Sequence, residues 1–252
     1  AIKESELLPL LIEGNDLFGL FIFYLIKIIL CYLFGDFEKA LNNSIEARKY
    51  AIATTGMTVK PVFYFYESLT ILATGNLQSN ENKYLLQILE ENQSELQQQW
   101  ANYAPMNYQH KVDLIEAEKC RVLGQKTEAI ELYEKAIFGA KVNEYLQEEA
   151  LANELTAKFY LDWGKEKAAI GYMQEAYYCY ARWGAKAKTD DLEKRYPQLL
   201  TAILQNQNND FQNVLNSTIQ TINSSRNSIS EALDCASIII ASQALSSTIQ
   251  LS

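Results

Sequence analysis

The chain has 252 residues, of which 48% are hydrophobic and 12% aromatic, so it can bury a large core and is not a disordered protein. Its 10 Gly and 4 Pro are too few for the many turns of an all-β protein. With 31 acidic against 22 basic residues, the net charge of −9 disfavours nucleic acid and anionic lipid as partners.

The first long apolar segment, residues 17–34, is interrupted only by Gly19 and Lys27. Its length approaches that of a membrane-spanning helix, so a membrane-anchored segment is one alternative. We favour a buried helix of a solenoid, because residues 34–40 have the sequence of a tight helix-to-helix turn and because basic residues that would orient a span are missing beside the segment. The flanking residues are acidic: Glu13, Asp16, Asp36 and Glu38.

Three stretches share one pattern, in which an apolar helix is followed by Gly, by Ala five residues later, and by a second Ala seven residues after that. We expect the Gly to end the first helix in a left-handed conformation, and the small Ala side chains to let the second helix pack closely. The three copies are Gly35, Ala40 and Ala47; Gly124, Ala129 and Ala136; and Gly164, Ala169 and Ala176.

A helix at 61–74 before Gly75 gives a weaker copy, and Gly184 gives a terminal half-copy. The period is 40 to 49 residues, longer than the usual thirty-four of tetratricopeptide repeats. The sequence therefore predicts an all-α fold, an irregular tetratricopeptide-like solenoid of helical hairpins. All four prolines are expected between helices: Pro9, Pro61, Pro105 and Pro197.

Between the copies we expect a helix over 80–100 and a loop over 101–109. Near the end of the repeats, Asp190 and Glu193 have the spacing of a capping box, which predicts the start of a short helix that Pro197 stops.

Composition changes after Leu200, and we expect a repeat domain at 1–200 and a polar linker at 201–228. Residues 229–252 are predicted to form an amphipathic helix that leads toward a following domain. This helix either pairs in a homodimer, packs on that domain, or folds back on the solenoid. Its apolar positions are Ile229, Leu233, Ala236, Ile240 and Ala244.

We assign no catalytic, cofactor-binding or metal-binding residue. The one histidine of the sequence, His110, is expected on the surface beside the 101–109 loop. Neighbouring carboxylates are expected on solvated helix faces: Glu116 and Glu118, Glu148 and Glu149, and Asp190 and Asp191. The four scattered cysteines are expected to be reduced, as in a cytoplasmic protein: Cys31, Cys120, Cys179 and Cys235.

The inner groove of such a solenoid is lined by the first helix of each hairpin, and register places Glu118, Arg121, Glu154 and Lys158 there. These four residues are the candidate groove for a peptide or a neighbouring domain. The alternative is that they form ordinary exposed pairs, such as Glu154 with Lys158 at i,i+4.

Many blocks of this sequence are similar to one family, and the most distinctive is Tyr-Ala-Arg-Trp-Gly-Ala-Lys-Ala-Lys at 180–188. The chain resembles the tetratricopeptide-like helical region of large cyanobacterial multidomain signalling kinases. Those proteins join a serine/threonine kinase, an AAA-type ATPase, this helical region, a GAF domain and a histidine kinase. Other similar blocks are 35–50, 56–73, 108–111, 122–126, 143–145, 148–155, 157–160, 163–165, 176–178, 191–193, 196–200 and 232–251.

The resemblance implies a place between an ATPase and a kinase output, but it carries over no catalytic residue. We therefore expect a non-catalytic protein-interaction and regulatory relay module of a large signal-transduction kinase. The segment itself is expected not to be an enzyme, whereas its parent chain is expected to be an ATP-dependent protein kinase. The expected partners are proteins, either neighbouring domains of the same chain or other chains.

Overall fold

The computed structural model describes residues 3–74 and 83–205, and none of these residues lies in a β-strand. The chain is an all-α solenoid of helical hairpins, as the sequence predicts. It divides into two units, residues 1–200 and 201–252. Residues 201–205 are helical. Gly75, the rest of the predicted linker and the predicted helix at 229–252 lie outside the described residues.

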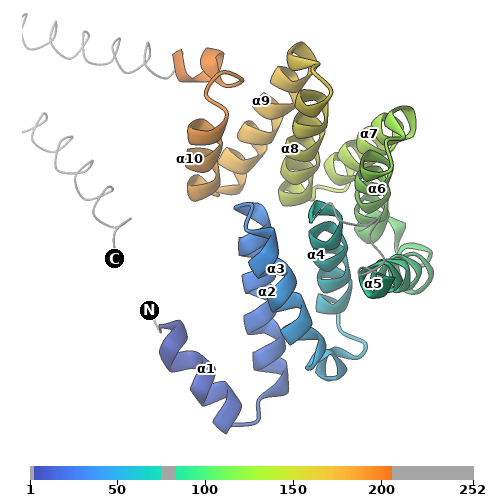
Figure 1. The fold of residues 1–252 in the computed structure, drawn as a ribbon, viewed down its shortest axis with the longest axis vertical. Helices are drawn as coiled ribbons and strands as arrows, with labels where there is room; N and C mark the ends of the chain where they lie inside the picture. Colours follow the sequence, from blue (N-terminus) through green and yellow to red (C-terminus); the bar gives the residue numbers. More distant parts are fainter. Residues whose placement is uncertain (1–2, 75–82, 206–252) are drawn as a thin grey trace, which may run out of the picture. The chain divides into compact units, whose positions relative to one another are not determined.

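The first unit is built from hairpins of antiparallel helices (Figure 1). The most extensive helix pairs are α8 with α9, α6 with α7, and α2 with α3. The α-helices are α1 (Glu4–Glu13), α2 (Leu17–Leu33), α3 (Phe37–Arg48), α4 (Val59–Ala73), α5 (Lys83–Glu95), α6 (Pro105–Val122), α7 (Lys126–Val142), α8 (Leu146–Asp162), α9 (Glu166–Trp183) and α10 (Lys186–Arg195). A 3₁₀ turn at Ala51–Thr54 follows α3, and a π-helical turn at Leu96–Ala101 follows α5.

One turn geometry is used again and again between consecutive helices. The residue before the next N-cap has a positive φ, and the N-cap N–H donates to the carbonyl five residues back. At the α2–α3 turn, for example, Gly35 has φ 79° and the Asp36 N–H donates to the Cys31 carbonyl. The same turn occurs at Asn15, Gly35, Gly124, Glu144, Gly164 and Gly184.

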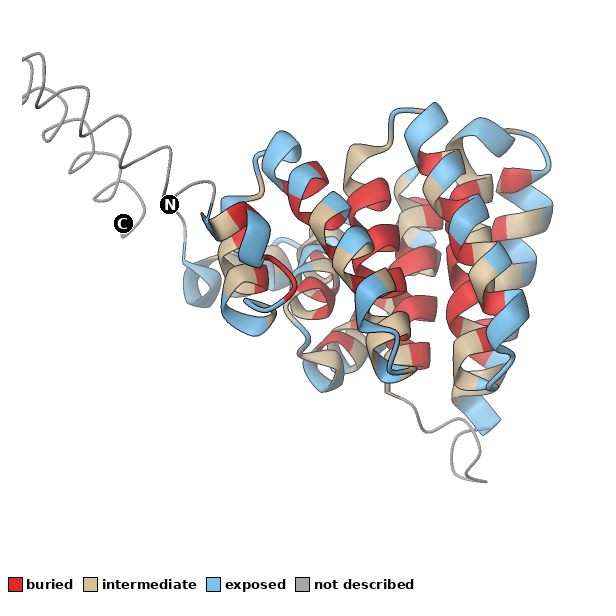
Figure 2. Ribbon diagram, turned by 90° about the horizontal axis from the view of Figure 1, so that it is seen from above, coloured by how far each residue is buried: buried red, intermediate tan, exposed pale blue. Residues whose placement is uncertain are grey.

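The alanines of the repeat pattern are the points of closest helix packing. Each is at most 1% exposed, so the second helices α3, α7 and α9 meet their neighbours through methyl groups. These residues are Ala40, Ala47, Ala129, Ala136, Ala169 and Ala176. Larger side chains fill the space between hairpins; the rings of Phe21 and Phe63, for example, pack edge to face at 5.4 Å across α2 and α4. Buried residues accordingly lie on the helix faces that meet other helices (Figure 2).

Three local expectations are wrong. Two prolines that were expected between helices lie inside them. Pro9 lies in α1, where the loss of one backbone hydrogen bond is tolerated, and Pro61 lies in the first turn of α4, where the backbone N–H has no partner within the helix. Helix α6 begins at Pro105, whose fixed φ suits the first helical position, so the predicted loop shrinks and His110 lies within α6. Asp190 caps no helix, because α10 begins at Lys186, directly after the turn at Gly184.

The segment for which a membrane anchor was the alternative forms α2, which has 17 residues and packs its buried side on helices α3 and α4. Across residues 3–74 and 83–205, no helix has both the length and the apolar character that crossing a membrane requires.

Candidate functional site

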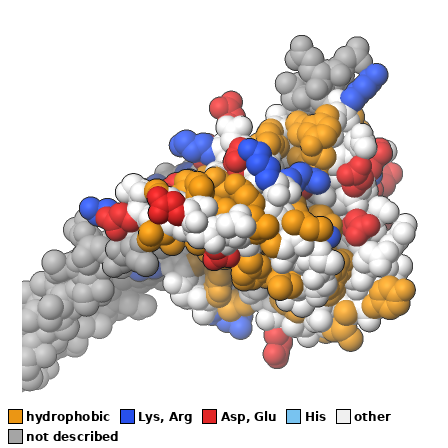
Figure 3. Space-filling view, turned by 90° about the horizontal axis from the view of Figure 1, so that it is seen from below, with side chains coloured by type: hydrophobic (Ala, Val, Ile, Leu, Met, Phe, Trp, Pro, Cys, Tyr) orange, Lys and Arg blue, Asp and Glu red, His pale blue; other side chains and the backbone are white. Residues whose placement is uncertain are grey.

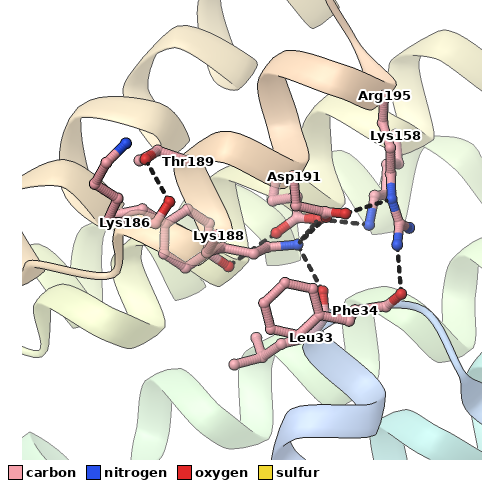
Figure 4. A network of polar contacts seen from close by, with 10 residues as sticks. Leu33, Phe34, Lys158, Lys186, Lys188, Thr189, Asp191 and Arg195 are labelled. Carbon is pink, nitrogen blue, oxygen red and sulfur yellow. Dashed lines mark hydrogen bonds and ion pairs between the residues drawn. The ribbon is translucent and has the colours of Figure 1, made fainter. Parts of the chain in front are cut away.

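The last helix of the repeat unit returns to the turn between α2 and α3 (Figure 4). Lys188 of α10 donates from Nζ to the Leu33 carbonyl at 2.6 Å, across 155 residues of sequence. Arg195, two turns further along α10, donates from Nη2 to the Phe34 carbonyl. Both carbonyls belong to the C-terminal end of α2, where helix carbonyls lack partners within the helix and attract cations. We call these four residues the α10–α2 junction.

Glu154 of α8 connects the junction to the predicted groove. Its Oε1 accepts from Lys188 at 2.9 Å and from Lys158 at 2.7 Å, and its Oε2 accepts from the Tyr180 hydroxyl at 2.8 Å. The Glu154 side chain is only 2% exposed. Asp191 adds a second carboxylate, 3.4 Å from Lys188 Nζ. Three elements, α8, α9 and α10, are therefore held by one buried carboxylate.

Glu118 of α6 is the centre of a second buried cluster. Arg121 donates to it from Nε at 3.0 Å and from Nη2 at 2.8 Å, and the Tyr133 hydroxyl of α7 donates to Oε1. The Glu118 side chain is 3% exposed, whereas the Arg121 side chain is 28% exposed. The carboxylate faces inward and the guanidinium reaches toward solvent.

A cavity of about 190 Å³ lies between these two clusters. Three of the four predicted groove residues line this cavity, namely Glu118, Arg121 and Lys158. The fourth, Glu154, does not line it but accepts a hydrogen bond from Lys158. Arg121 and Lys158 supply N–H donors at this cavity, which suits acceptor groups of a partner. The full lining is Tyr32, Phe37, Ala73, Glu118, Arg121, Leu155, Lys158 and Asp162.

Electrostatics fixes the charge states at this site. Burial alone would raise the pKa of Glu154, but Lys158 and Lys188 outweigh it and lower that pKa to about 2. Burial would lower the pKa of Lys158, yet the Glu154 carboxylate raises it. The pKa of Tyr180 is raised well above 10, first by burial and then by Glu154. The tyrosine therefore stays a hydrogen-bond donor at neutral pH.

The alternative interpretation of the groove residues was that they form ordinary exposed ion pairs, and the contacts agree with it in part. Glu154 and Lys158 do form an i,i+4 pair. The pair is not an ordinary exposed one, because its carboxylate is buried and shared with Lys188 of another helix. Removing one partner of such a pair costs more than breaking a surface ion pair, because it leaves a buried charge without compensation.

A third cluster surrounds His110, which is 2% exposed instead of lying on the surface. Lys111 Nζ lies 3.0 Å from His110 Nε2 and 3.0 Å from Glu148 Oε1. Glu148 is buried because α8 packs on both sides. The prediction of a solvated face is therefore wrong for Glu148 and Glu149, and it is wrong for Glu118, which is 2% exposed over the whole residue. Burial, and then the charge of Lys111, lowers the pKa of His110 to about 3. Burial also lowers the pKa of Lys111, against the opposing effect of Glu148.

A fourth cluster lies between α3, α4 and α5. Arg48 donates to both oxygens of Glu67, from Nε at 2.8 Å and from Nη2 at 2.7 Å. Asn92 donates to Glu67 Oε2 at 2.9 Å and accepts from Arg48 Nη2 at 2.9 Å. The Glu67 side chain is 1% exposed, which makes this bidentate pair a joint between three helices.

Sequence reasoning missed Lys188, Tyr180, Glu67 and Lys111 as functional or structural centres. One signal was present: Glu67 is the single acidic residue in the otherwise apolar or neutral segment 61–74, and such a charge needs a buried partner. Lys188 carries no comparable signal, because it is one of several charged residues along α10 and nothing in the sequence distinguishes the buried one from the others.

Together, the fold and these clusters define an all-α helical-hairpin solenoid with buried charged side chains between its helices. By sequence, the chain is similar to the hybrid signal transduction histidine kinase G of Dictyostelium discoideum, with 45% identity over 56 residues. The match spans 22% of this chain and 2% of that protein. No family model matches the chain, and no solved structure matches it significantly. The similarity links the chain to a signalling kinase.

Proposed function

We propose that this chain is a non-catalytic protein-interaction and regulatory relay module of a large multidomain signal-transduction kinase. The observation that carries the proposal is the 45% identity over 56 residues to a signal transduction histidine kinase. The solenoid of helical hairpins supports it, because stacked hairpins form extended surfaces for protein partners. The proposal includes a cytoplasmic parent chain with histidine kinase and serine/threonine kinase activity, in which this region resembles tetratricopeptide repeats beside AAA and GAF domains.

The α10–α2 junction gives this proposal a physical route. A relay needs an element with two arrangements that partners stabilise differently. At the junction, Lys188 and Arg195 hold the end of the repeat unit against its second helix through two carbonyl contacts. The arrangement with both contacts formed is the closed one, and the arrangement with both contacts broken is the open one. A partner that binds at the neighbouring cavity would stabilise one of the two, and a kinase joined to the unit would be sensitive to the difference.

The test uses the purified gene product that contains these residues. We would measure the rate of phosphohistidine formation with radiolabelled ATP for the unsubstituted protein, for the double variant Lys188→Met/Arg195→Met, and for Lys186→Met. Lys186 is the matched control, because it lies on the same helix and pairs only with the exposed Asp190 at 2.8 Å. We expect the junction variant to change the rate at least threefold and the control to leave it unchanged.

The isolated 252-residue chain is assayed in parallel and should transfer no phosphate. Two results would contradict the proposal. One is phosphotransfer by the isolated chain, which would make it an enzyme. The other is a gene product whose phosphorylation is absent, or is the same with and without the junction substitutions.

A further inference from the structure

The hairpin α1–α2 presents an apolar surface that residues 37–74 and 83–200 do not cover. Helix α1 has no buried residue, although residues 7–12 are all apolar. Helix α2 has one charged residue, Lys27, among its 17 residues, and helices of such apolar character are normally enclosed on all sides. Five large side chains on this hairpin are 41–61% exposed: Leu10, Ile12, Phe18, Ile26 and Leu30.

Helix α1 is fixed on α2 at both ends, so this surface is preformed. Near the α1–α2 turn, α1 closes on Gly19, where an added Cβ would lie 2.8 Å from Leu11 Cδ2. At the other end, Glu4 forms an ion pair with Lys27. The side chains of Leu7, Leu8 and Leu11 are half-buried between the two helices. The outer residues therefore stay exposed because nothing further packs on them within the described chain.

Hydrogen-bond acceptors accompany the apolar residues. Pro9 has no N–H, so the Ser5 carbonyl lacks its regular helical donor. Ser5 and Pro9, together with Glu4 and Leu8, line an open hollow of about 520 Å³ on α1. The hollow combines a carbonyl without its helical donor, two apolar side chains and the carboxylate of Glu4, one oxygen of which already pairs with Lys27. This combination fits the long side chain of a lysine or an arginine.

Charge complementarity points to the same kind of partner. Glu6 and Glu13, two turns apart on α1, are exposed and form no ion pair with the described residues. Figure 3 looks onto the end of the repeat unit that carries the α1–α2 turn, and hydrophobic side chains gather there with acidic and basic groups at their border. An apolar surface with an acidic border attracts a helix that has one apolar face and basic residues along its edges.

We infer that the α1–α2 hairpin is a docking surface for a basic amphipathic helix of a partner protein. The apolar face of that helix packs on Leu10, Ile26 and Leu30. Its lysine or arginine side chains reach Glu6, Glu13 and the hollow at Ser5. This site is separate from the inner groove and from the α10–α2 junction, so it is independent of the relay proposed above.

The experiment measures binding of a fluorescein-labelled, 18-residue Leu/Lys helix, with leucine on one face and lysine on the other, to the whole chain. Fluorescence anisotropy gives the affinity at two salt concentrations. We compare Leu10→Ser/Ile26→Ser, which removes apolar contacts, and Glu6→Gln/Glu13→Gln, which removes acidic groups. The matched controls are Phe138→Ser/Val142→Ser, since these side chains are 68% and 60% exposed on α7, and Glu131→Gln, which is exposed on the same helix.

We expect each α1–α2 variant to weaken binding at least tenfold, and each control to weaken it less than twofold. A peptide of the same composition with its leucines spread around the helix should bind at least tenfold more weakly. Equal binding of the two peptides, or equal effects of the α7 and α1–α2 substitutions, would overturn the inference. Circular dichroism confirms that every variant is folded.

Two further measurements exclude other occupants. Sedimentation equilibrium is measured for the unsubstituted chain and for Leu10→Ser/Ile26→Ser. We expect the substitutions to leave the oligomeric state unchanged. Neutral phosphatidylcholine vesicles should not retain the chain through these residues. A dimer or vesicle binding that this variant abolishes would assign the surface to a second copy or to lipid, and the inference would be wrong.

Discussion

Lys188 donates to the Leu33 carbonyl at 2.6 Å and to Glu154 at 2.9 Å, so one buried ammonium group joins the last helix of the repeat unit to its second helix and to its eighth. The Lys188 side chain is 4% exposed. Removing it takes the donor from the Leu33 carbonyl and one of two ammonium partners from the buried Glu154 carboxylate, and this kind of loss is costly in a protein interior.

We therefore predict that Lys188→Met lowers the free energy of unfolding by about 3 kcal/mol, near the lower limit for breaking a buried ion pair. Lys158 and Tyr180 still contact Glu154, which limits the loss. Urea denaturation followed by circular dichroism measures the change. Lys186→Met is the control, because its side chain is 62% exposed, and it should leave stability within error. Equal effects at the two positions would contradict the prediction.

The Arg48–Glu67–Asn92 cluster predicts a second large effect. Glu67→Gln keeps the volume but removes the charge that Arg48 contacts through two hydrogen bonds. We expect a loss of about 3 kcal/mol in the free energy of unfolding. Glu46→Gln, which removes an exposed i,i+3 partner of Lys49, should have no measurable effect. Thermal unfolding of both variants gives the comparison, and a small effect of Glu67→Gln would show that the buried pair contributes little.

We predict that His110 lowers the free energy of unfolding of the chain in mild acid. Its pKa is about 3 in the folded chain and near 6.5 when unfolded. Between these values the unfolded chain binds more protons, so stability is fully present above pH 6.5 and falls as the pH decreases toward 3. Glu154 contributes its own loss only between pH 4.5 and about 2.

The measurement is the free energy of unfolding from pH 7 to pH 4.5, a range that lies above the Glu154 transition. His110→Gln should have a clearly shallower decline over this range, because it has no imidazole to protonate. The absolute stability of the variant does not enter the comparison, since only the slope with pH is used. Parallel curves for the two proteins would show that His110 does not cause the acid sensitivity.

We predict that the same substitution, glycine to alanine, lowers the free energy of unfolding by different amounts at two turns. Gly35 and Gly124 have φ values of 79° and 76°, so alanine is strained at both, by about 1–2 kcal/mol. A Cβ at Gly124 meets open space, whereas at Gly35 it would lie 2.8 Å from Arg195 Nη1. We expect Gly35→Ala to destabilise the chain by about 0.5–1 kcal/mol more than Gly124→Ala, because the flexible end of Arg195 must shift and its contact with the Phe34 carbonyl is displaced.

A double-variant comparison isolates that extra cost. In an Arg195→Ala background, Gly35→Ala should cost no more than Gly124→Ala does. The same excess with and without Arg195 would mean that the junction is not responsible.

Much of the fold follows from local patterns in the sequence. Gly35, Gly124, Gly164 and Gly184 mark helix-ending turns, because glycine adopts positive φ without a steric penalty. The turns at Asn15 and Glu144 use the same geometry without glycine, so the sequence pattern does not show them. Pro9 and His110 were misjudged, because a helix that packs on its neighbours extends past a weak local signal.

The candidate groove was predictable only in part. Glu118, Arg121, Glu154 and Lys158 lie on first helices of hairpins, and helical register alone places them near one another. Register does not say whether a charged side chain on such a helix meets water or another helix. The same i,i+4 spacing of Glu154 and Lys158 occurs in exposed and in buried pairs.

The sequence alone determined the all-α class, the position of most turns and the small residues at which helices pack, because these depend on backbone sterics within a few residues. Only the tertiary structure decided that Lys188 meets Leu33 and that Glu154 and Glu67 are buried. The physical reason is that each hairpin adds a small rotation to the stack. Which distant residues meet depends on the sum of those rotations, and no local pattern encodes that sum.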